Sequence, residues 1–285
     1  MAIFTNQATL RYNNVVRNSN VTVGQLLEAV TITKTAVTGT YSPDEAITYI
    51  ISILNTGTTA LTGLTLTDNL GAYTTGGATL YPLSYTDASL TYYVNGVLQA
   101  SPAVNDGPPL TITGISIPAG GNATLEYEAT PNEFAPVASG STITNTASLQ
   151  GIGVSTPVTA SAVISVRNNT DLTITKSLSP TIVSENGQLT YTFLLQNTGN
   201  TAALAEDNIA VSDTFLPRLT NVVVTYNGTT LTNGVEYTYD ETTGEFATTP
   251  GFITVPAATS ERNAETNEIE TTPGFAEINV SGNVI

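Results

Sequence analysis

The chain has 285 residues, seven of them Lys or Arg and 23 Asp or Glu, which gives a net charge of −16. This charge repels phosphate, so we expect neither nucleic acid nor an anionic membrane as a partner. His and Cys are absent, which removes the common zinc ligands, thiol nucleophiles, the imidazole base and disulfides. We therefore expect no metal and no cofactor.

In chain order, residues 24–166 are predicted to form a first β-sandwich repeat. Thr and β-branched residues favour strands over helices, and turn signals such as Asn95–Gly96 separate the apolar runs. Several short strands with regular turns are typical of an immunoglobulin-like sandwich. The expected strands are VTITK ending at Lys34, AITYIISIL, LTGLTLTD ending at Asp68, LTYYVNGVLQ, LTITGISI, GGNATLEYEA, STITNTASLQG and VTASAVISV.

Residues 167–285 repeat the same order and are predicted to form a second sandwich. LTITK ends at Lys176, LTYTFLLQNTG follows, and IAVSD ends at Asp213. Lys34 and Lys176 are the only two lysines, and each stands at the same place in its copy. The predicted fold is all-β, with two tandem immunoglobulin-like β-sandwich domains preceded by residues 1–23, an N-terminal donor strand and linker.

The pattern K…Y…NTG…D…ITNTA resembles the bacterial surface-protein repeat called domain of unknown function eleven, the "conserved repeat domain". The resemblance covers nearly the whole chain, twice. It implies immunoglobulin-like modules of cell-surface and appendage proteins, and hence a structural or adhesive role. The closing strand of the family carries an Asn in an ITNTA context, which corresponds here to Asn145.

The second copy departs from this pattern because it is predicted to lack its last strand. Its final segment, PGFAEINVSGNVI, matches GGNATLEYEA of the first copy, and nothing in it corresponds to STITNTASLQG. The N-terminal segment IFTNQATLRY matches that strand instead, with Asn6 in place of Asn145. The predicted donor strand presents Ile3, Phe4, Asn6, Ala8 and Leu10.

A sandwich without an internal strand exposes unpaired backbone groups and an apolar slot. Burying two to four apolar side chains in that slot contributes on the order of 3–12 kcal/mol, which is comparable with the stability of a whole domain. The filling strand could come from the same chain or from the next one. Donation from chain to chain is a heterologous contact, which builds open filaments when it does not close into a ring.

Lys, Asp and Asn that meet in a dry core can form a covalent bond. Desolvation leaves the lysine as a nucleophilic amine and keeps the carboxyl protonated, so the acid polarises the Asn amide and shuttles protons. Attack by the amine expels ammonia and leaves an isopeptide bond. Self-crosslinking immunoglobulin-like modules of bacterial pili use the same three residue types, so the family resemblance supports this chemistry.

We predict two such bonds. Lys34 and Asn145 would be joined within the chain with help from Asp68, and Lys176 would be joined to Asn6 of another chain with help from Asp213. The alternative is that Lys34–Asp68 and Lys176–Asp213 are structural ion pairs. Asn279 or Asn283 could replace Asn6 as a partner within the chain, although the matching strand of the first copy bears no such Asn.

The favoured function is a structural subunit of an extracellular, pilus-like or spore-appendage-like fibre, polymerising with itself at a cell or spore surface. No secretory signal is recognisable at the N-terminus. The alternative is a surface adhesion module that binds a glycan or a host protein through its Tyr-rich stretches, Tyr81, Tyr85, Tyr92 and Tyr93. We expect no enzyme beyond the self-modifying sites, because no other nucleophile–base pair is evident.

Overall fold

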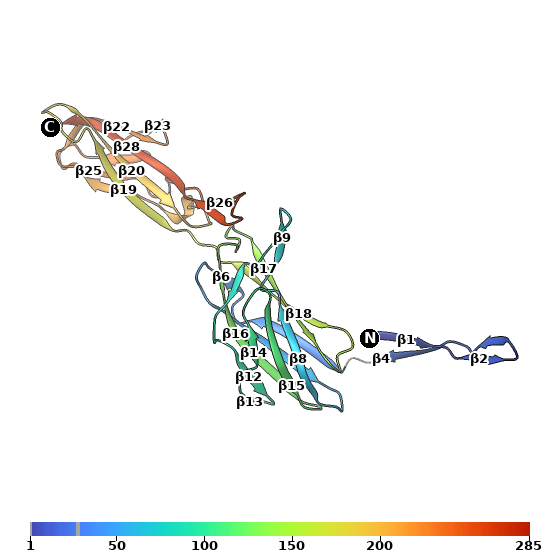
Figure 1. Cartoon of the computed structure of the whole chain (residues 1–285). Coiled ribbons are helices and arrows are strands. Elements are labelled where there is room, and N and C mark those ends of the chain that lie inside the picture. The colour runs from blue at the N-terminus through green and yellow to red at the C-terminus, as the bar shows by residue number, and fades with distance from the viewer. Residues whose placement is uncertain (1, 27–28) are drawn as a thin grey trace. The chain divides into compact units, whose positions relative to one another are not determined.

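The computed structural model describes residues 2–26 and 29–285 of the chain (Figure 1). Apart from the short 3-10 segment η1 (Ala205–Asp207), its regular elements are all strands. The chain divides into two compact units, Met1–Pro136 with Ser141–Val166 and Val137–Gly140 with Arg167–Ile285. The predicted all-β class with two tandem sandwiches is confirmed. None of the helical segments described here is long and apolar enough to cross a membrane.

The N-terminal segment forms a long two-stranded hairpin. Its strands are β1 (Ala2–Asn6), β2 (Thr9–Tyr12), β3 (Val15–Asn18) and β4 (Thr22–Leu26). β1 pairs with β4 and β2 with β3, both antiparallel. The tip is Asn13–Asn14, both with positive φ (46° and 61°), as a two-residue type I′ turn requires. One extra residue on the returning side separates the two ladders, which is a bulge.

This hairpin corrects one feature of the prediction. The residues expected to form a linker, 13–23, supply the tip, β3 and the start of β4 instead. The physical reason is local: the Asn turn reverses the chain so that the returning residues satisfy the backbone groups of the first strand. The bulge is held by Ser19, whose N–H donates to the Ala8 carbonyl (2.9 Å) and whose hydroxyl accepts from the Ala8 N–H (3.0 Å).

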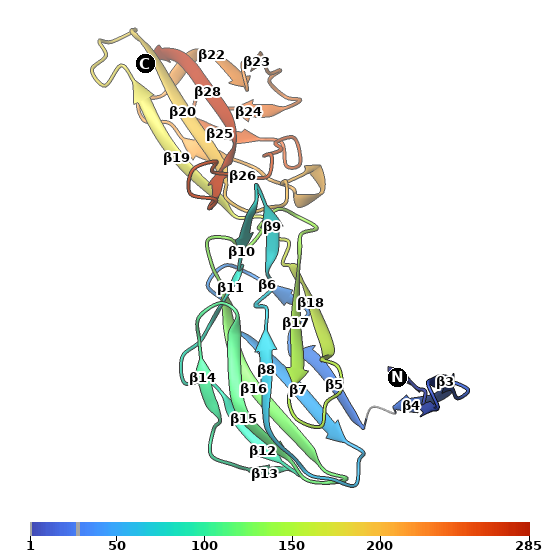
Figure 2. The ribbon, with the colours of Figure 1, turned by 45° about the vertical axis from the view of Figure 1, so that its right-hand side comes forward.

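The first sandwich contains two sheets that face each other (Figure 2). One sheet has the order β13-β12-β16-β7-β5, with β11 also paired to β16, and the other has the order β14-β15-β8-β17-β18-β6. Alternating β-branched and aromatic side chains face inward along each long strand, as in β7, where every second residue is buried. The strands are β5 (Val30–Ala36), β6 (Thr40–Tyr41), β7 (Ile47–Asn55), β8 (Leu61–Asp68), β9 (Tyr73–Thr75), β10 (Ala78–Leu80), β11 (Leu83–Tyr85), β12 (Thr91–Val94), β13 (Val97–Leu98), β14 (Ala103–Asn105), β15 (Leu110–Ile117), β16 (Asn122–Pro131), β17 (Thr142–Gln150) and β18 (Val158–Val166).

Two strands close the first sandwich on the side of the lysine. β17 pairs with β8, so that Ala147 lies opposite Asp68, and β18 pairs with β17. β18 also lies beside β5, the first strand of the other sheet. The inward side chains of β18, among them Ala162 and Ile164, are buried there. The core is therefore continuous between the two sheets at this side.

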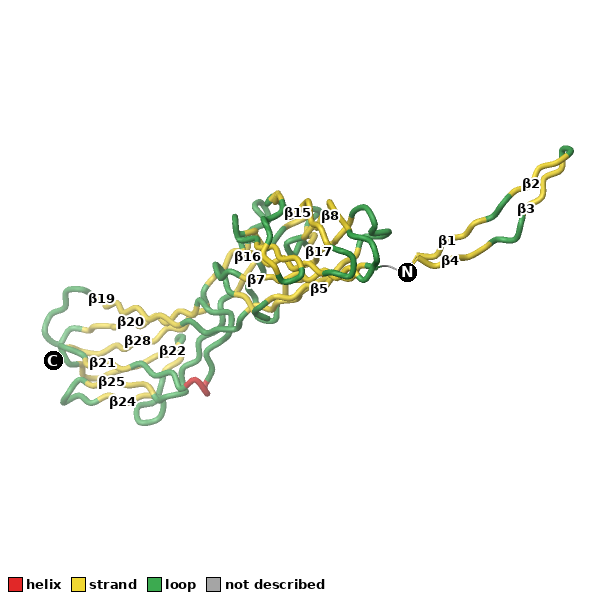
Figure 3. The backbone as a smooth tube through the Cα atoms, turned by 90° about the horizontal axis from the view of Figure 1, so that it is seen from below, coloured by secondary structure: helices red, strands yellow, loops and turns green. Residues whose placement is uncertain are grey.

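The second sandwich repeats much of this arrangement (Figure 3). Its larger sheet has the order β19-β20-β28-β22-β23 and its smaller sheet the order β21-β25-β24, while β26 and β27 form a separate hairpin. Tyr191, Phe193, Phe215 and Phe246 stack in its core. The strands are β19 (Leu172–Ser179), β20 (Gln188–Asn197), β21 (Ser212–Thr214), β22 (Leu219–Tyr226), β23 (Thr229–Thr230), β24 (Tyr237–Tyr239), β25 (Glu245–Thr248), β26 (Thr259–Arg262), β27 (Ile269–Thr272) and β28 (Gly274–Val284).

The two repeats differ at one edge. In the first, β8 is paired on both sides, with β15 and with β17. In the second, β21 is paired with β25 on one side, and no strand of residues 2–26 or 29–285 lies on its other side. All eight residues of β19 are correspondingly exposed, whereas β5 alternates buried and exposed residues. The matching residues Ile32 and Ile174 are 8 % and 53 % exposed.

This difference predicts unequal costs for one substitution. Ile32→Ala should destabilise the first unit by about 2–4 kcal/mol, because it leaves a cavity in a closed core. Ile174→Ala should destabilise the second unit of the unassembled subunit by less than about 1 kcal/mol, because the side chain is half solvated. Hydrogen–deuterium exchange read by mass spectrometry follows the two units separately. Equal losses would contradict the open edge of the second repeat.

Candidate functional site

Lys34 is a charged side chain at an apolar position. It follows Val30 and Ile32 at intervals of two on β5, and all three are buried. Period-two alternation therefore directs the lysine between the sheets. Its Nζ lies 4.7 Å from the ring centroid of Tyr49 and 5.8 Å from that of Tyr127, where the ring faces stabilise the cation.

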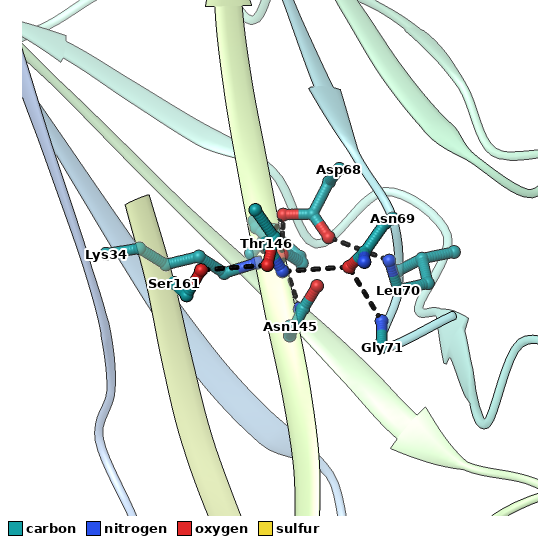
Figure 4. Close-up of polar contacts among 9 residues, drawn as sticks. Lys34, Asp68, Asn69, Leu70, Gly71, Asn145, Thr146 and Ser161 are labelled. Atoms are coloured by element: carbon teal, nitrogen blue, oxygen red, sulfur yellow. Dashed lines mark hydrogen bonds and ion pairs between the residues drawn. The ribbon is translucent and has the colours of Figure 1, made fainter. Parts of the chain in front are cut away.

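Asp68 ends β8 beside this lysine and is fully buried (Figure 4). Its Oδ2 accepts hydrogen bonds from Lys34 Nζ (2.5 Å) and from the Tyr127 hydroxyl (2.6 Å). Its Oδ1 accepts the backbone N–H of Leu70 at 3.0 Å. Three donors thus compensate a buried carboxylate for its lost hydration.

Asn145 reaches the same point from β17 and is also fully buried. Its Nδ2 donates to the Tyr127 hydroxyl at 3.2 Å. Its Oδ1 has no hydrogen-bond donor among the described residues, which is uncommon for a buried amide. The neighbouring backbone is fixed by Asn69, whose Oδ1 accepts the N–H groups of Thr146 (2.8 Å) and Gly71 (3.0 Å).

Burial makes the neutral amine of Lys34 easier to reach at this site than in water. Burial lowers the pKa of Lys34 from its usual 10.5 to about 8, although the charge of Asp68 and its hydrogen bond oppose the shift. Burial raises the pKa of Tyr127 well above its usual value, with the charge of Asp68 adding to the shift. The Tyr127 phenol therefore stays protonated and can donate to the carboxylate.

The predicted trio Lys34, Asp68 and Asn145 is brought together in one buried cluster, but the sequence analysis missed the two tyrosines. Tyr49 and Tyr127 lie opposite each other on β7 and β16, with ring centroids 5.6 Å apart. The available signal was the period of two, because ITYI and LEYEA each place a Tyr on the inward face. Nothing in the pattern separated these from other core aromatics.

The second site holds a matching but open pair. Lys176 on β19 forms an ion pair with Asp213 Oδ2, and their side chains are 40 % and 21 % exposed. Lys176 Nζ lies 4.4 Å from the ring centroid of Tyr191 and 5.4 Å from that of Phe215. Tyr191 matches Tyr49 in register, but the residue opposite Tyr191 is Val280, so the phenol that bonds Asp68 has no counterpart at that position.

Asn6 lies on β1. It pairs with Thr22 in the N-terminal hairpin. The two possible substitutes are engaged elsewhere: Asn279 accepts the Thr192 hydroxyl at 2.6 Å, and Asn283 donates to the Asn186 carbonyl at 3.0 Å. Of the predicted donor residues, Phe4, Asn6, Ala8 and Leu10 are exposed, and Ile3 lies outside the residues whose side chains are described.

The tyrosines considered for an adhesive surface serve the first sandwich. Tyr92 is buried, and its hydroxyl donates to the Ser116 carbonyl at 2.6 Å. Tyr81 and Tyr85 pack against the core, and the Tyr85 hydroxyl accepts the Leu90 N–H at 3.2 Å. Only Tyr93 remains as a half-exposed side chain without a role in that core. Within the described ranges no group of three or more Asp or Glu side chains is placed to hold a metal ion.

The chain matches no protein-family model and no curated protein, so its likeness to domain of unknown function eleven stays a prediction. Solved structures similar to it include BcpA, the major pilin subunit of Bacillus cereus, with 14 % identity and a TM-score of 0.37 over 95 % of this chain and 73 % of that one. The full-length major pilin SpaD from Corynebacterium diphtheriae has 13 % identity and a TM-score of 0.37 over 87 % of this chain and 49 % of that one.

A family 123 glycoside hydrolase from Clostridium perfringens is also similar, with 8 % identity and a TM-score of 0.33 over 49 % of this chain and 28 % of that one. The chain therefore spans about half the length of SpaD and less than a third of the hydrolase. At these TM-scores none of the three structures bears on function, which has to follow from the residues of this chain.

The lowered pKa of Lys34 predicts a pH dependence in protein that cannot crosslink. In an Asn145→Ala background, the unfolded chain holds the Lys34 proton up to its usual pKa of 10.5, whereas the folded chain releases it near 8. The unfolded state then binds more protons between these values, so the free energy of unfolding should rise with pH, by up to about 3 kcal/mol from this group.

The matched control is Lys34→Met in the same background. The difference in unfolding free energy between the two variants, measured with urea from pH 7 to 10, isolates the lysine from the tyrosines that titrate above it. A difference that stays constant over this range would show that the folded lysine keeps its usual pKa.

Proposed function

We propose that this chain is the structural subunit of an extracellular fibre and polymerises head to tail. The observation that supports the proposal is the open edge of β21 beside Lys176 and Asp213. The equivalent edge of β8 is covered by β17, which carries Asn145. An uncovered sheet edge next to half-exposed apolar residues is a template for an incoming strand.

The incoming strand that fits is the N-terminal segment of the next subunit, Ala2–Tyr12. Transferring the register of the first repeat places Ala8 of that subunit opposite Asp213, as Ala147 lies opposite Asp68. Asn6 of the next subunit then stands where Asn145 stands, beside Lys176. The donating and accepting surfaces differ, so the contact is heterologous and extends into an open filament at a cell or spore surface.

Covalent bonds would stabilise this fibre. In the first repeat, Asp68 takes a proton from Lys34, and the neutral Nζ attacks Cγ of Asn145. The protonated acid donates to Asn145 Oδ1, which has no other donor, as negative charge develops there. The bond from Cγ to Nδ2 then breaks, and Nδ2 takes up this proton and leaves as ammonia. Nζ gives its second proton to Asp68, and a neutral amide joins the two side chains.

The same reaction would join two subunits, with Lys176 attacking Asn6 of the next subunit, Asp213 carrying the proton and ammonia leaving. No substrate is consumed other than the protein's own side chains, so the chain acts once on itself and is not an enzyme. The likeness in residue types to self-crosslinking pilus modules supports this chemistry. An adhesive role is less well supported, because Tyr92 is buried and Tyr81 and Tyr85 pack against the first core.

The intrachain bond is tested by intact mass. Wild-type protein should be lighter than its sequence by one ammonia for this bond, and Asp68→Ala should abolish that loss. The variant should also lose about 3–5 kcal/mol of stability, because Lys34 is left buried without its counter-ion. The exposed Asp87→Ala serves as the matched control and should keep the mass deficit. An unmodified mass in folded wild-type protein would leave only the ion pair at this site.

The interchain bond is tested by boiling fibres in detergent. Wild-type fibres should give a ladder or fail to enter a gel, since their subunits are covalently joined. Asn6→Ala should still assemble but dissociate on boiling, because the strand remains and the amide is lost. Deleting residues 1–12 should leave monomers. Polymerisation of the truncated protein, or crosslinked peptides with Lys176 bonded only within its own chain, would refute head-to-tail donation.

A further inference from the structure

The first repeat is closed by a hairpin, not by a single strand. β17 brings Asn145 to the lysine, and β18 runs back beside β5 and covers the lysine strand. In the second repeat β19 takes the place of β5, and Leu172, Ile174 and Leu178 on it are exposed. A single donated strand would supply the counterpart of β17 alone. It would leave β19 uncovered and Lys176 beside water.

The N-terminal hairpin carries the cross-strand pairs that both missing strands need. Asn6 lies opposite Thr22 and Phe4 opposite Gly24, as Asn145 lies opposite Ala162 and Ile143 opposite Ile164 in β17 and β18. Because directly opposed residues share one face of a sheet, Thr22 and Gly24 face the same side as Asn6. The outward residue Val23 is 67 % exposed, like its counterpart Val163 at 57 %.

The sizes of these pairs are complementary. In the first repeat two Ile side chains, Ile143 and Ile164, are buried opposite each other. In the hairpin the large Phe4 faces a glycine, and a Cβ on Gly24 would lie 2.3 Å from the Phe4 ring. The ring thus lies over the bare backbone of β4. The pair of Phe4 and Gly24 replaces a pair of two Ile residues, with one large and one absent side chain in place of two of medium size, and packed cores tolerate exchanges of this kind.

The charges of the hairpin and of the rest of the chain also favour another copy of this chain as the acceptor of the hairpin. Residues 2–26 contain Arg11 and Arg17 and none of the 23 acidic residues. The hairpin is therefore positively charged, whereas the remaining chain holds every carboxylate and only five basic residues. Opposite charges on the hairpin and on the remaining part of a second copy speed their encounter. Repulsion between the acidic parts of two copies disfavours contacts that do not involve the hairpin.

We infer that the donated element is the whole hairpin, residues 2–26, and that β4 lies against β19 of the preceding subunit as β18 lies against β5. This inference rests on the proposed head-to-tail assembly and adds the second strand. The occupant of the open side is thus a second copy of this chain, which contributes Phe4, Asn6, Thr22 and Gly24 to one core.

Thiol labelling of assembled fibres tests the second strand. The chain has no cysteine, so Thr22→Cys and Val23→Cys each introduce a single thiol, on opposite faces of β4. In fibres, Cys at 22 should react with a maleimide at least about tenfold more slowly than in monomers, whereas Cys at 23 should react equally in both. Equal reactivity at both positions in fibres would show that β4 is not buried against β19, which would refute donation of the whole hairpin but not donation of a single strand.

A second pair of variants tests the same face by packing. Gly24→Ile should abolish most fibre formation, because it opposes Phe4 with a side chain the core has no room for. Adding Phe4→Ile rebuilds the Ile pair of the first repeat and should restore fibres. If Gly24→Ile assembles normally while the deletion of residues 1–12 gives monomers, donation of the whole hairpin is refuted and donation of a single strand is not. Fibres from that deletion would refute the head-to-tail assembly on which the inference rests.

Discussion

The burial of a lysine–aspartate pair between two β-sheets is the constraint on which the rest of this structure depends. Removing both charges from water costs several kcal/mol per ion, and their attraction repays this only when further donors complete the site. In the first repeat Tyr127 and the Leu70 N–H provide those donors to Asp68. The closing hairpin of β17 and β18 then shields the pair from water and brings the buried Asn145 beside it.

The second repeat holds the matching pair without a closing hairpin among the described residues. Lys176 and Asp213 are in contact but remain partly solvated, which reduces the free-energy cost of removing the two charges from water. Lys176 Nζ lies over three aromatic rings, compared with two for Lys34 Nζ. Val280 stands where the first repeat has Tyr127. In the proposed fibre, crosslinking at the second site would therefore depend on the strand that covers β19.

Much of the site could be predicted from the sequence because it depends on short-range rules. Period-two alternation places Lys34, Asp68 and Asn145 on inward faces, and the repeat shows which residues correspond. The N-terminal hairpin was missed because its returning half contains polar residues such as Ser19 and was interpreted as a linker up to residue 23. The Asn13–Asn14 turn was the available signal. The packing of Phe4 over Gly24 depends on cross-strand register, which composition does not reveal.

The positions of Lys34 and Asn145 along the chain have a mechanical consequence. The lysine is on the first strand of its sandwich and the asparagine on the last strand but one. With a covalent bond between them, tension entering at β5 passes through that bond to β17 and leaves through β18. The 110 residues between the two ends of the bond would then lie in a closed loop outside the path of the load, and stretching a fibre of such subunits would do no work on most of the domain.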